Sequence, residues 1–412
     1  MRILYLSQYF PPEAGATQTR AYEMAHTFVR LGHTVTILSE IPNHPSGIIP
    51  PNYRGKWLER VELDGIDVIR VWVKASPKKD FRSRMFFYLS YMLTSFLAGI
   101  FWARGRYDLI YCSSPPLFAG VSGFALSLIK HIPFFFEVRD LWPESAVALG
   151  ELSNPRFIRL AKELENSCYR HARKIIVVTQ GIRDRLVERS IPHEKIVLIP
   201  NGANLQTFQF DPDGRQKLRN ELGWQDCFIA IYAGIFGLAQ GLETVLEAAH
   251  LLLKNPYIRI LLIGDGPLKS KIAEHAQRLN LPNLQILPEQ PRERMPALLS
   301  AADAALVPLR KLDLFKGALP SKIFDAWACE RPVLISIDGE ARQIVESAQG
   351  GRYIEPEDPR ALAETLVELS LNLSDCAQMG INGRTFTAAH YSRPVLAEQL
   401  CQILQTEIKL ED

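Results

Sequence analysis

Hydrophobic and polar positions follow two alternating patterns along the first half of the chain. Short, uninterrupted apolar runs rich in β-branched residues predict strands, and between them apolar residues recur at helical spacing. The strand-like runs are Ile3–Leu6, Val35–Leu38, Val68–Val73, Leu109–Cys112, Phe134–Val138, Ile175–Val178 and Ile196–Ile199. Helical segments such as Thr19–Leu31 and Pro155–His171 separate them. This alternation is typical of a parallel sheet covered by helices on both faces.

A second series of the same kind begins at Phe228. It comprises the segments "FIAIYAG", "IRILLIGDG", "NLQILP", "DAALVPL", "RPVLIS" and "GRYI". The stretch before it, "IPNGANLQTFQFDPDGRQKLRNELGW", is rich in turn-forming residues. Because 412 residues exceed one ordinary core, we expect two doubly wound α/β domains. Ligands of such sheets bind at the carboxyl ends of the strands, which points to a cleft between the domains.

One apolar segment departs from this pattern. Residues Met85–Ala103, "MFFYLSYMLTSFLAGIFWA", are almost uncharged, and basic residues flank them at Lys78, Lys79, Arg82, Arg84, Arg104 and Arg106. The segment is about long enough to cross a bilayer, but a crossing would place strands of one sheet on opposite sides. Two interpretations stay open: a helix packed on the first sheet, or one whose outer face rests on an anionic membrane surface. The first residues, "MRILYLSQYF", predict a strand and not a signal peptide.

Composition narrows the functional classes. The chain is 47% hydrophobic and 22% charged, and its formal charge is +2. Nucleic-acid-binding proteins use a concentrated basic surface, and this near-neutral charge gives no reason to expect one. Six scattered cysteines, with no C-x-x-C pair, indicate a reducing compartment and no metal site. The first strand-to-helix turn holds only Gly15, so the G-x-G-x-x-G dinucleotide pattern is absent, and no Walker loop or H-E-x-x-H occurs.

Several turns after predicted strands carry candidate chemistry. In "LPSKIFDAWACERPVLIS", Lys322 and Asp325 lie three residues apart at a helix start, where the helix dipole attracts anions. They form either an intrahelical ion pair or a site for a phosphate next to a hydroxyl. The turns "YAGIFGLAQGL", with Gly234 and Gly237, and "LLIGDGP" leave the same predicted sheet and are either phosphate-binding loops or plain turns.

The first predicted domain has its own candidate turn. The segment "FFFEVRDLWPESAVALG" leaves a buried strand and presents Glu137, Arg139, Asp140 and Glu144. A structural turn would use Gly, Asn or Ser instead. We expect a catalytic or acceptor-binding role, with a solvated turn or an Arg139–Asp140 salt bridge as the alternative.

Taken together, these segments resemble the family-4 retaining glycosyltransferases. The resemblance rests on "ILYLSQYFPPEAGATQTR", "LGHTVTILS", "EVRDLWPESAVALG", "IPNGAN", "YAGIFGLAQGL", "LLIGDGP", "AADAALVPL" and "PSKIFDAWACERPVL", in that order. It implies the GT-B fold, with two Rossmann-like domains that face a cleft. Residues 1–203 would bind the acceptor and 204–390 the nucleotide-sugar donor, and a helix in 391–412 would pack back on the first domain.

The segments "RDLWPES", "GLAQGL" and "PSK" are most similar to the branch typified by N-acetyl-L-fucosaminyl transferases of bacterial surface-polysaccharide synthesis. This implies a UDP-N-acetylated sugar as donor and a lipid-linked saccharide as acceptor, for O-antigen, capsule or exopolysaccharide. The enzyme would be cytoplasmic, associate peripherally with the inner membrane, and use neither metal nor cofactor. The implied catalytic residues are Arg139, Asp140 and Lys322; those for the donor are Gly234, Gly237, Gly264, Asp265, Pro320, Ser321, Lys322 and Asp325; those for the acceptor are Gly15, Thr17 and Glu144.

The chain departs from the family pattern at five positions. The two glutamates that the family places eight residues apart correspond to Gly317 and Asp325, and the family's Arg and Lys for the diphosphate correspond to Ile235 and Gln240. We expect Lys322 to take over this cationic role, aided by Lys316 or Arg310. The family's frequent histidine before Asp140 is Arg139 here. A UDP-GlcNAc 2-epimerase of the same fold and a non-catalytic nucleotide-sugar-binding partner remain alternatives.

Overall fold

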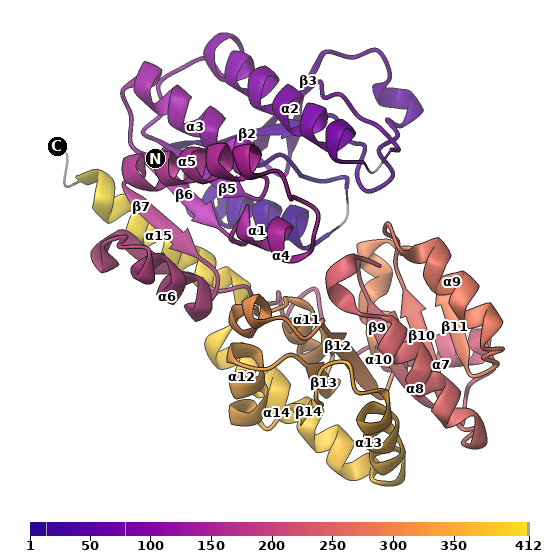
Figure 1. The fold of residues 1–412 in the computed structure, drawn as a ribbon. Coiled ribbons are helices and arrows are strands. Elements are labelled where there is room, and N and C mark those ends of the chain that lie inside the picture. Colours follow the sequence, from indigo (N-terminus) through magenta and orange to yellow (C-terminus); the bar gives the residue numbers. More distant parts are fainter. Residues whose placement is uncertain (14, 79, 410–412) are drawn as a thin grey trace. The chain divides into compact units, whose positions relative to one another are not determined.

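The computed structural model describes residues 1–13, 15–78 and 80–409. The chain forms two compact units: Met1–Pro200 with Arg393–Asp412, and Asn201–Ser392 (Figure 1). Of the expected features, Lys79 and the end of the C-terminal segment at 410–412 lie outside the described residues.

The first unit is built on an eight-stranded sheet in the order β3-β4-β2-β1-β5-β6-β7-β8. All neighbouring strands pair in parallel except β3 and β4, which are antiparallel. The strands are β1 (Arg2–Leu6), β2 (Thr34–Glu40), β3 (Leu58–Leu63), β4 (Ile66–Val71), β5 (Leu109–Ser114), β6 (Phe134–Val138), β7 (Lys174–Val177) and β8 (Ile196–Leu198). The chain order reverses between β1 and β5, and such a point is where ligands bind in doubly wound sheets.

Strand β3 was not predicted from the sequence. It is an edge strand whose outward positions are polar, so its sequence "LERVEL" lacks a continuous apolar run. Its turn into β4 is formed by Asp64 and Gly65, both with positive φ (50° and 77°). An Asp-Gly pair with two positive φ angles is the typical type I′ hairpin turn, so the sequence did hold a signal.

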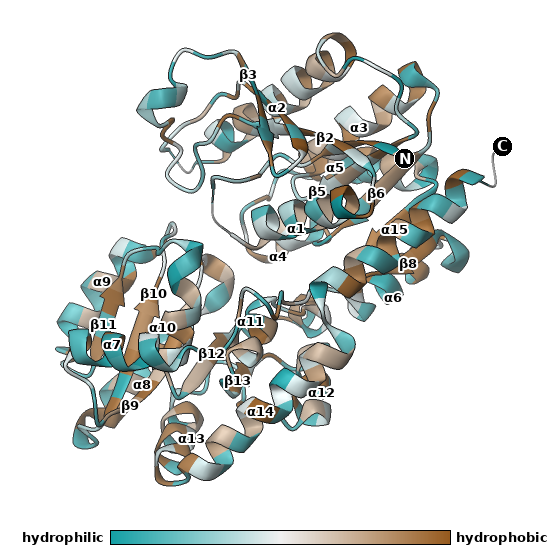
Figure 2. Cartoon of the chain, turned by 180° about the vertical axis from the view of Figure 1, so that it is seen from behind, coloured by the Kyte–Doolittle hydropathy of each residue, from teal (hydrophilic) through white to brown (hydrophobic). Residues whose placement is uncertain are grey.

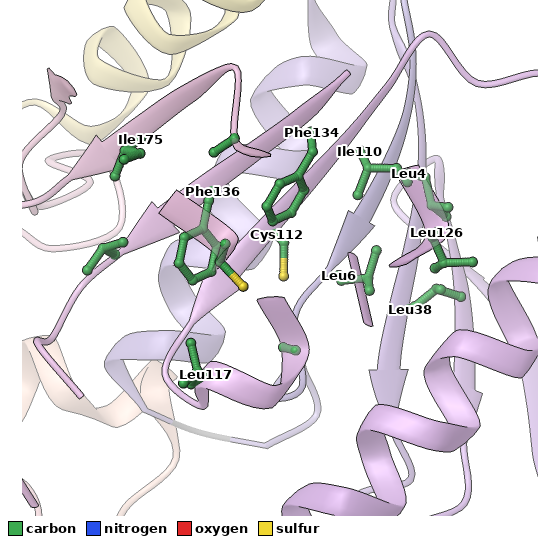
Figure 3. Close-up of a cluster of buried hydrophobic side chains, with 14 of the residues drawn as sticks. Leu4, Leu6, Leu38, Ile110, Cys112, Leu117, Leu126, Phe134, Phe136 and Ile175 are labelled. Atoms are coloured by element: carbon green, nitrogen blue, oxygen red, sulfur yellow. The ribbon is translucent and has the colours of Figure 1, made fainter. Parts of the chain in front are cut away.

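Helices cover both faces of this sheet. They are α1 (Ala16–Arg30), α2 (Phe81–Phe101), α3 (Leu117–Lys130), α4 (Glu144–Ala148), α5 (Pro155–His171), α6 (Gln180–Glu188) and α15 (Arg393–Lys409). On one face, Figure 3 shows strand side chains such as Leu6, Cys112 and Phe136 meeting Leu117 and Leu126 of α3.

The opposite face of the first sheet packs against α1 and the C-terminal helix. Strand residues such as Ile3 and Val35 pack there with Phe28 of α1, together with Leu396, Leu400 and Leu404 of α15. The expected return of the C-terminal helix to the first unit is therefore confirmed.

The second unit contains a parallel six-stranded sheet in the order β11-β10-β9-β12-β13-β14. Its strands are β9 (Phe228–Ala233), β10 (Ile258–Ile263), β11 (Leu284–Leu287), β12 (Ala304–Pro308), β13 (Val333–Ser336) and β14 (Gly351–Tyr353). Its helices are α7 (Pro212–Leu222), α8 (Glu243–Leu251), α9 (Lys269–Arg278), α10 (Met295–Ala301), α11 (Lys322–Ala328), α12 (Glu340–Ala348), α13 (Pro359–Leu371) and α14 (Leu373–His390). Figure 2 shows apolar strands such as β10 beside helices with polar residues, such as α9. The chain order reverses between β9 and β12.

Helix α2 is the one helix in the described ranges that is long and apolar enough to cross a membrane, by length and composition only. It packs within the first unit through polar as well as apolar contacts. Tyr91 donates a hydrogen bond to the Leu38 carbonyl (2.7 Å), Thr94 donates to the Trp72 carbonyl (2.9 Å), and the Ser95 and Ser122 hydroxyls lie 3.0 Å apart. A core helix of a water-exposed domain would make the same contacts.

Candidate functional site

In the second unit, the loops that follow β9 and β10 pack so closely that only glycine fits at two positions of the β10 loop. A Cβ on Gly264 would lie 1.9 Å from the Gly234 carbonyl oxygen, and one on Gly266 would lie 2.6 Å from the Phe236 carbonyl oxygen. Buried Phe236 donates its N–H to the Asp265 carbonyl (2.8 Å) and accepts from Leu268 N–H (2.9 Å). The structure therefore explains Gly264 and Gly266 by close loop packing, at the carboxyl end of the sheet.

Lys322 lies at the carboxyl end of β9. Its ammonium is 4.1 Å from the centroid of the Tyr232 ring, and a Cβ on Gly234 would be 2.7 Å from Nζ. Within the described residues Lys322 forms no salt bridge, and its side chain is half-buried. Burial lowers its pKa to about 7, although the Asp325 carboxylate works in the opposite direction. The Lys322 ammonium thus lies against an aromatic face and, among the described residues, forms no salt bridge.

The loop between β9 and α8 begins at Gly234, directly beside this cation. In the part of the chain that the structure describes, the N–H groups of Ile235 and Gly237 donate to no acceptor. Gly237 also makes room for Gln240, because a Cβ there would lie 2.7 Å from Gln240 Oε1. Free amides beside a cation are suited to the oxygens of a phosphate.

The two other cations expected to assist are engaged elsewhere. Arg310 binds the loop itself: its Nε donates to the Leu238 carbonyl (2.7 Å) and its N–H to the Ala239 carbonyl (2.8 Å). Arg310 also lies 3.4 Å from a carboxylate oxygen of Glu243. Lys316 is exposed and pairs with Asp313 at 2.8 Å. Arg310 therefore supports the loop, and Lys322 is left as the cation beside the free amides.

Helix α11 holds Lys322 and Asp325 one turn apart. Its opposite face is buried through Ile323, Phe324 and Trp327, and Trp327 donates a hydrogen bond from Nε1 to the Gly350 carbonyl (2.7 Å). This packing fixes the rotation of the helix, so both charged side chains are half-buried on the remaining face. Pro320 and Ser321 precede the first helical residue, and the Ser321 side chain makes no capping hydrogen bond.

The first unit contains a buried charge network at the end of β6. Glu137 accepts hydrogen bonds from Arg20 Nε (2.8 Å), the Tyr111 hydroxyl (2.9 Å) and the Ser113 hydroxyl (2.6 Å). Burial alone would raise the pKa of Glu137, but the positive charges of Arg20 and Arg139 bring it below its ordinary value. Glu137 therefore stays ionised and organises the arginines instead of facing a substrate.

Arg139 adds a second positive charge to this network. Its Nη1 donates to Thr17 Oγ1 (3.0 Å), so the structure brings together two of the predicted site residues. Its Nε lies 3.7 Å from Glu137 Oε2, and within the described residues neither Nε nor Nη2 has a hydrogen-bond partner. Burial lowers the pKa of Arg139, which the Glu137 carboxylate opposes. The Glu137 carboxylate thus forms ion pairs with the guanidinium groups of both Arg20 and Arg139.

The remaining predicted residues of this unit lie around the same turn but have different surroundings. Asp140 accepts a hydrogen bond from the Ser145 hydroxyl (2.7 Å), and burial raises its pKa. Gly15 is exposed immediately before α1. Glu144 faces the guanidinium groups of Arg185 (3.6 Å) and Arg189 (3.7 Å), so its carboxylate is already paired. The roles of these residues remain predictions.

Sequence reasoning did not single out Tyr232 or Arg20. Tyr232 lies within the apolar run of β9, where an aromatic residue reads as core, and its hydroxyl donates to the Ile235 carbonyl (2.6 Å). Arg20 lies within a helix and is buried by contacts with β6 and the end of the unit. A buried arginine is rare without a partner, and only the fold reveals that partner.

Both units match known domain families. Residues 15–202 match the family described as Glycosyl transferase 4-like domain, and residues 214–386 match Glycosyl transferases group 1. The chain is 26% identical to WcaI of Escherichia coli (strain K12), named as a colanic acid biosynthesis glycosyl transferase, over 88% of this chain and 90% of that protein.

Two solved structures share the fold over nearly the full length. Sucrose-phosphate synthase from Thermosynechococcus elongatus superposes with a TM-score of 0.76 at 20% identity, covering 98% of each chain. Anabaena HepE in complex with UDP-glucose has a TM-score of 0.74 at 18% identity, covering 98% of this chain and all of that one (100%). Over residues 15–202 and 214–386 the chain therefore carries the two domains of a GT-B glycosyltransferase, a glycosyl transferase 4-like domain followed by a group 1 domain.

Proposed function

We propose that the protein transfers a sugar from a nucleotide-sugar donor to a lipid-linked saccharide, with retention of anomeric configuration, in bacterial surface-polysaccharide synthesis. The observation that carries the proposal is the ammonium of Lys322 in the group 1 domain, which lies beside Gly234 and forms no salt bridge with any residue that the structure describes. The similarity to WcaI, named for colanic acid biosynthesis, and to HepE, solved in complex with UDP-glucose, supports a polysaccharide product and a UDP-sugar donor. We propose an N-acetylated sugar as the transferred group.

The proposed catalysis depends on stabilising the negative charge that develops on the leaving diphosphate. In the transition state the leaving diphosphate gains negative charge, so a fixed cation and fixed amide dipoles directed at it lower the barrier. Lys322 supplies the charge, and the amides of Ile235 and Gly237 supply the dipoles. Asp325, one turn along α11, accepts a hydrogen bond from a ribose hydroxyl. The leaving phosphate takes the acceptor's proton, so no strong general base is required.

The first unit is assigned to the acceptor and to catalytic support. Arg139 contributes a second cation, Asp140 a carboxyl group whose pKa is raised by burial, and Gly15, Thr17 and Glu144 border the acceptor.

Titration calorimetry with UDP, and with GDP for comparison, tests the donor assignment. We expect UDP to bind and Lys322→Ala to weaken it by about tenfold or more, because a charge-assisted contact contributes about 1.5–3 kcal/mol. The matched control is Lys316→Ala, which removes an exposed lysine paired with Asp313. Equal UDP affinity in the wild type and Lys322→Ala contradicts the proposed role of Lys322. Product analysis distinguishes a transferase, which releases UDP, from an epimerase, which makes a new UDP-sugar.

We further propose that the enzyme works at the cytoplasmic surface of the inner membrane, through helix α2. Along one face of this helix Phe86 (65%), Leu93 (57%) and Phe101 (55%) are exposed. Residues 81–136 contain a single acidic residue, and the exposed arginines Arg82, Arg104 and Arg106 lie near the two ends of the helix. An apolar stripe with basic ends matches an anionic lipid surface.

Flotation with vesicles tests the membrane assignment. We expect the protein to float with vesicles that contain phosphatidylglycerol and to remain below with phosphatidylcholine alone. Leu93→Glu is expected to abolish flotation, whereas Leu371→Glu, at a 71% exposed leucine on α13, should leave it unchanged. Equal flotation of the two variants contradicts the role of α2.

A further inference from the structure

Two tryptophans form an exposed pair at the edge of the first sheet. Trp57 directly precedes β3 and Trp72 directly follows β4, and the Trp72 N–H donates to the Trp57 carbonyl (2.9 Å). Their ring centroids lie 4.9 Å apart at an interplanar angle of 36°. Trp72 is half-buried, but 71% of the Trp57 surface is exposed, so one face of its indole is free. Tryptophan is highly buried on average, and this exposure therefore marks a candidate binding surface.

The surface beside the pair is open to solvent. Asn52, Arg54, Gly55 and Lys56, which lead into β3, are all exposed. A Cβ on Gly55 would meet no atom within 4 Å, so the space beside this part of the segment is unfilled by the described residues. A ligand can therefore approach the free face of Trp57 from solvent, without displacing any buried group.

Positive charge lies next to the pair. Lys56 and Arg70 share one carboxylate, because Glu59 accepts from Lys56 Nζ (2.7 Å) and from Arg70 Nη1 (2.8 Å). Arg54 is exposed and forms no salt bridge with any residue that the structure describes. Residues 41–58 contain no aspartate or glutamate. These charges favour an anionic partner.

The pair lies on the face of the sheet that α2 does not cover. Val71 and Val73, the neighbours of Trp72, pack in the core with Tyr91 of α2. Successive side chains of a strand point to opposite faces, so Trp72 points away from α2, and the ring contact places Trp57 with it. A bilayer that rests on α2 would lie on the other side of the sheet, which disfavours lipid as the partner of this pair.

The pair lies at the end of the sheet that is assigned to the acceptor. It follows the carboxyl end of β4, and ligands of doubly wound sheets bind at the carboxyl ends. Arg70, on the same face as Trp72, donates from Nη2 to the Pro11 carbonyl (3.0 Å). Pro11 belongs to the loop between β1 and α1, which contains Gly15 and leads to Thr17. The same loop therefore connects the pair to the residues proposed for the acceptor.

We propose that the Trp57–Trp72 pair is a platform for an acidic saccharide, formed by sugars of the acceptor chain beyond the reacting end. The identification of this saccharide as the acceptor rests on the proposed function. The C–H groups on one face of a sugar ring are apolar and carry partial positive charge, so they pack on the negative π face of the Trp57 indole. A sugar carboxylate beside that ring pairs with Arg54 or Lys56.

Saturation-transfer NMR titrations of the full chain test the platform. One probe is hyaluronan tetrasaccharide, which contains glucuronate, and the other is chitotetraose, which contains N-acetylglucosamine alone. We expect the acidic probe to bind the wild type more tightly, and Trp57→Ala to weaken the binding of both probes about fivefold, because the stacking surface is lost. Arg54→Gln should weaken the acidic probe about threefold and leave the neutral probe unchanged, because it removes an exposed charge.

The matched controls lie away from the platform. Trp102→Ala removes another exposed indole, one that contacts the ring of Phe101. Arg278→Gln removes one exposed positive charge from α9. Both control variants should bind the two probes as the wild type does. Because Trp57 is mostly exposed, Trp57→Ala should keep the melting temperature of the wild type, so its loss of binding is not a loss of fold.

The outcomes separate this proposal from the donor assignment. The platform is overturned by unchanged affinity in Trp57→Ala, by equal weakening in Trp102→Ala, or by a wild type that binds neither tetrasaccharide. It is also overturned if Trp57→Ala loses flotation with phosphatidylglycerol vesicles but keeps tetrasaccharide binding, because the pair then contacts lipid. If UDP and GDP fail to bind while the wild type binds the tetrasaccharide and Trp57→Ala does not, the donor assignment is overturned and the platform stands.

Discussion

The affinity for UDP should depend on pH through Lys322. Burial lowers the pKa of this lysine to about 7. At pH 8 the unliganded side chain is then about 90% neutral, and at pH 6 about 90% charged. A diphosphate bound against it favours the ammonium form, because an opposite charge within about 4–6 Å raises a lysine pKa. Binding at pH 8 must therefore take up about 0.9 proton, and the lysine by itself would raise the apparent Kd about tenfold from pH 6 to pH 8, or about 1.4 kcal/mol.

Calorimetry in buffers of different ionisation enthalpy measures this proton uptake directly. The terminal phosphate of UDP itself loses a proton near about pH 6, which strengthens binding over the same range. Lys322→Arg isolates the lysine contribution, because arginine stays charged and should show almost no proton uptake at pH 8. Proton uptake near zero in the wild type, or equal uptake in the wild type and Lys322→Arg, would refute the inference that Lys322 is the group that takes up a proton when UDP binds.

Three further predictions follow from the same contacts. Gly234→Ala should weaken UDP binding about tenfold or more in calorimetry, because its Cβ would lie 2.7 Å from Lys322 Nζ at a φ of 151°. Trp327→Phe should lower the free energy of unfolding by about 1–3 kcal/mol in urea titrations, because it removes the 2.7 Å hydrogen bond to the Gly350 carbonyl, which keeps only the Val333 N–H, and leaves a void beside the smaller buried ring. Burial raises the pKa of Glu13 to about 7, so the folded state favours the protonated form. This contribution to stability is present at pH 4 and is lost as the pH rises through 7, so Glu13→Gln should flatten the fall in melting temperature between pH 5 and pH 8.

Each of these changes has a matched control. Gly105→Ala has a similarly positive φ of 113° with no atom near its Cβ, Trp57→Phe alters a 71% exposed indole, and Glu62→Gln removes an exposed carboxylate. If a variant and its control have equal effects, the contact named is not the cause. The cause is then backbone strain for the glycine pair, the aromatic substitution itself for the tryptophan pair, and the change in net charge for the glutamate pair.

Much of the fold could be predicted because its local patterns are strong. The apolar runs of β1, β5 and β6 are buried on both faces, and their short length and their β-branched and aromatic residues predict strands instead of helices. Strand β3 was missed because an edge strand buries only one face, and its polar positions break the run. The candidate site could be predicted only in part. Lys322 and Asp325 stand out as two charged residues three positions apart, whereas Tyr232 lies within an apolar strand and looks like a core residue.

The sequence by itself determined that Gly234, Arg139 and Asp140 directly follow strands and that Lys322 begins a helix. Only the tertiary structure decided which charges are already paired. It turns Glu144 toward Arg185, uses Arg310 to hold a loop, and leaves the Lys322 ammonium against an aromatic ring. It also gathers Glu13 and Glu40, from separate segments, into one buried cluster. Spacing along the chain fixes the position of a residue in its element, but ion pairing and burial depend on which elements meet in space.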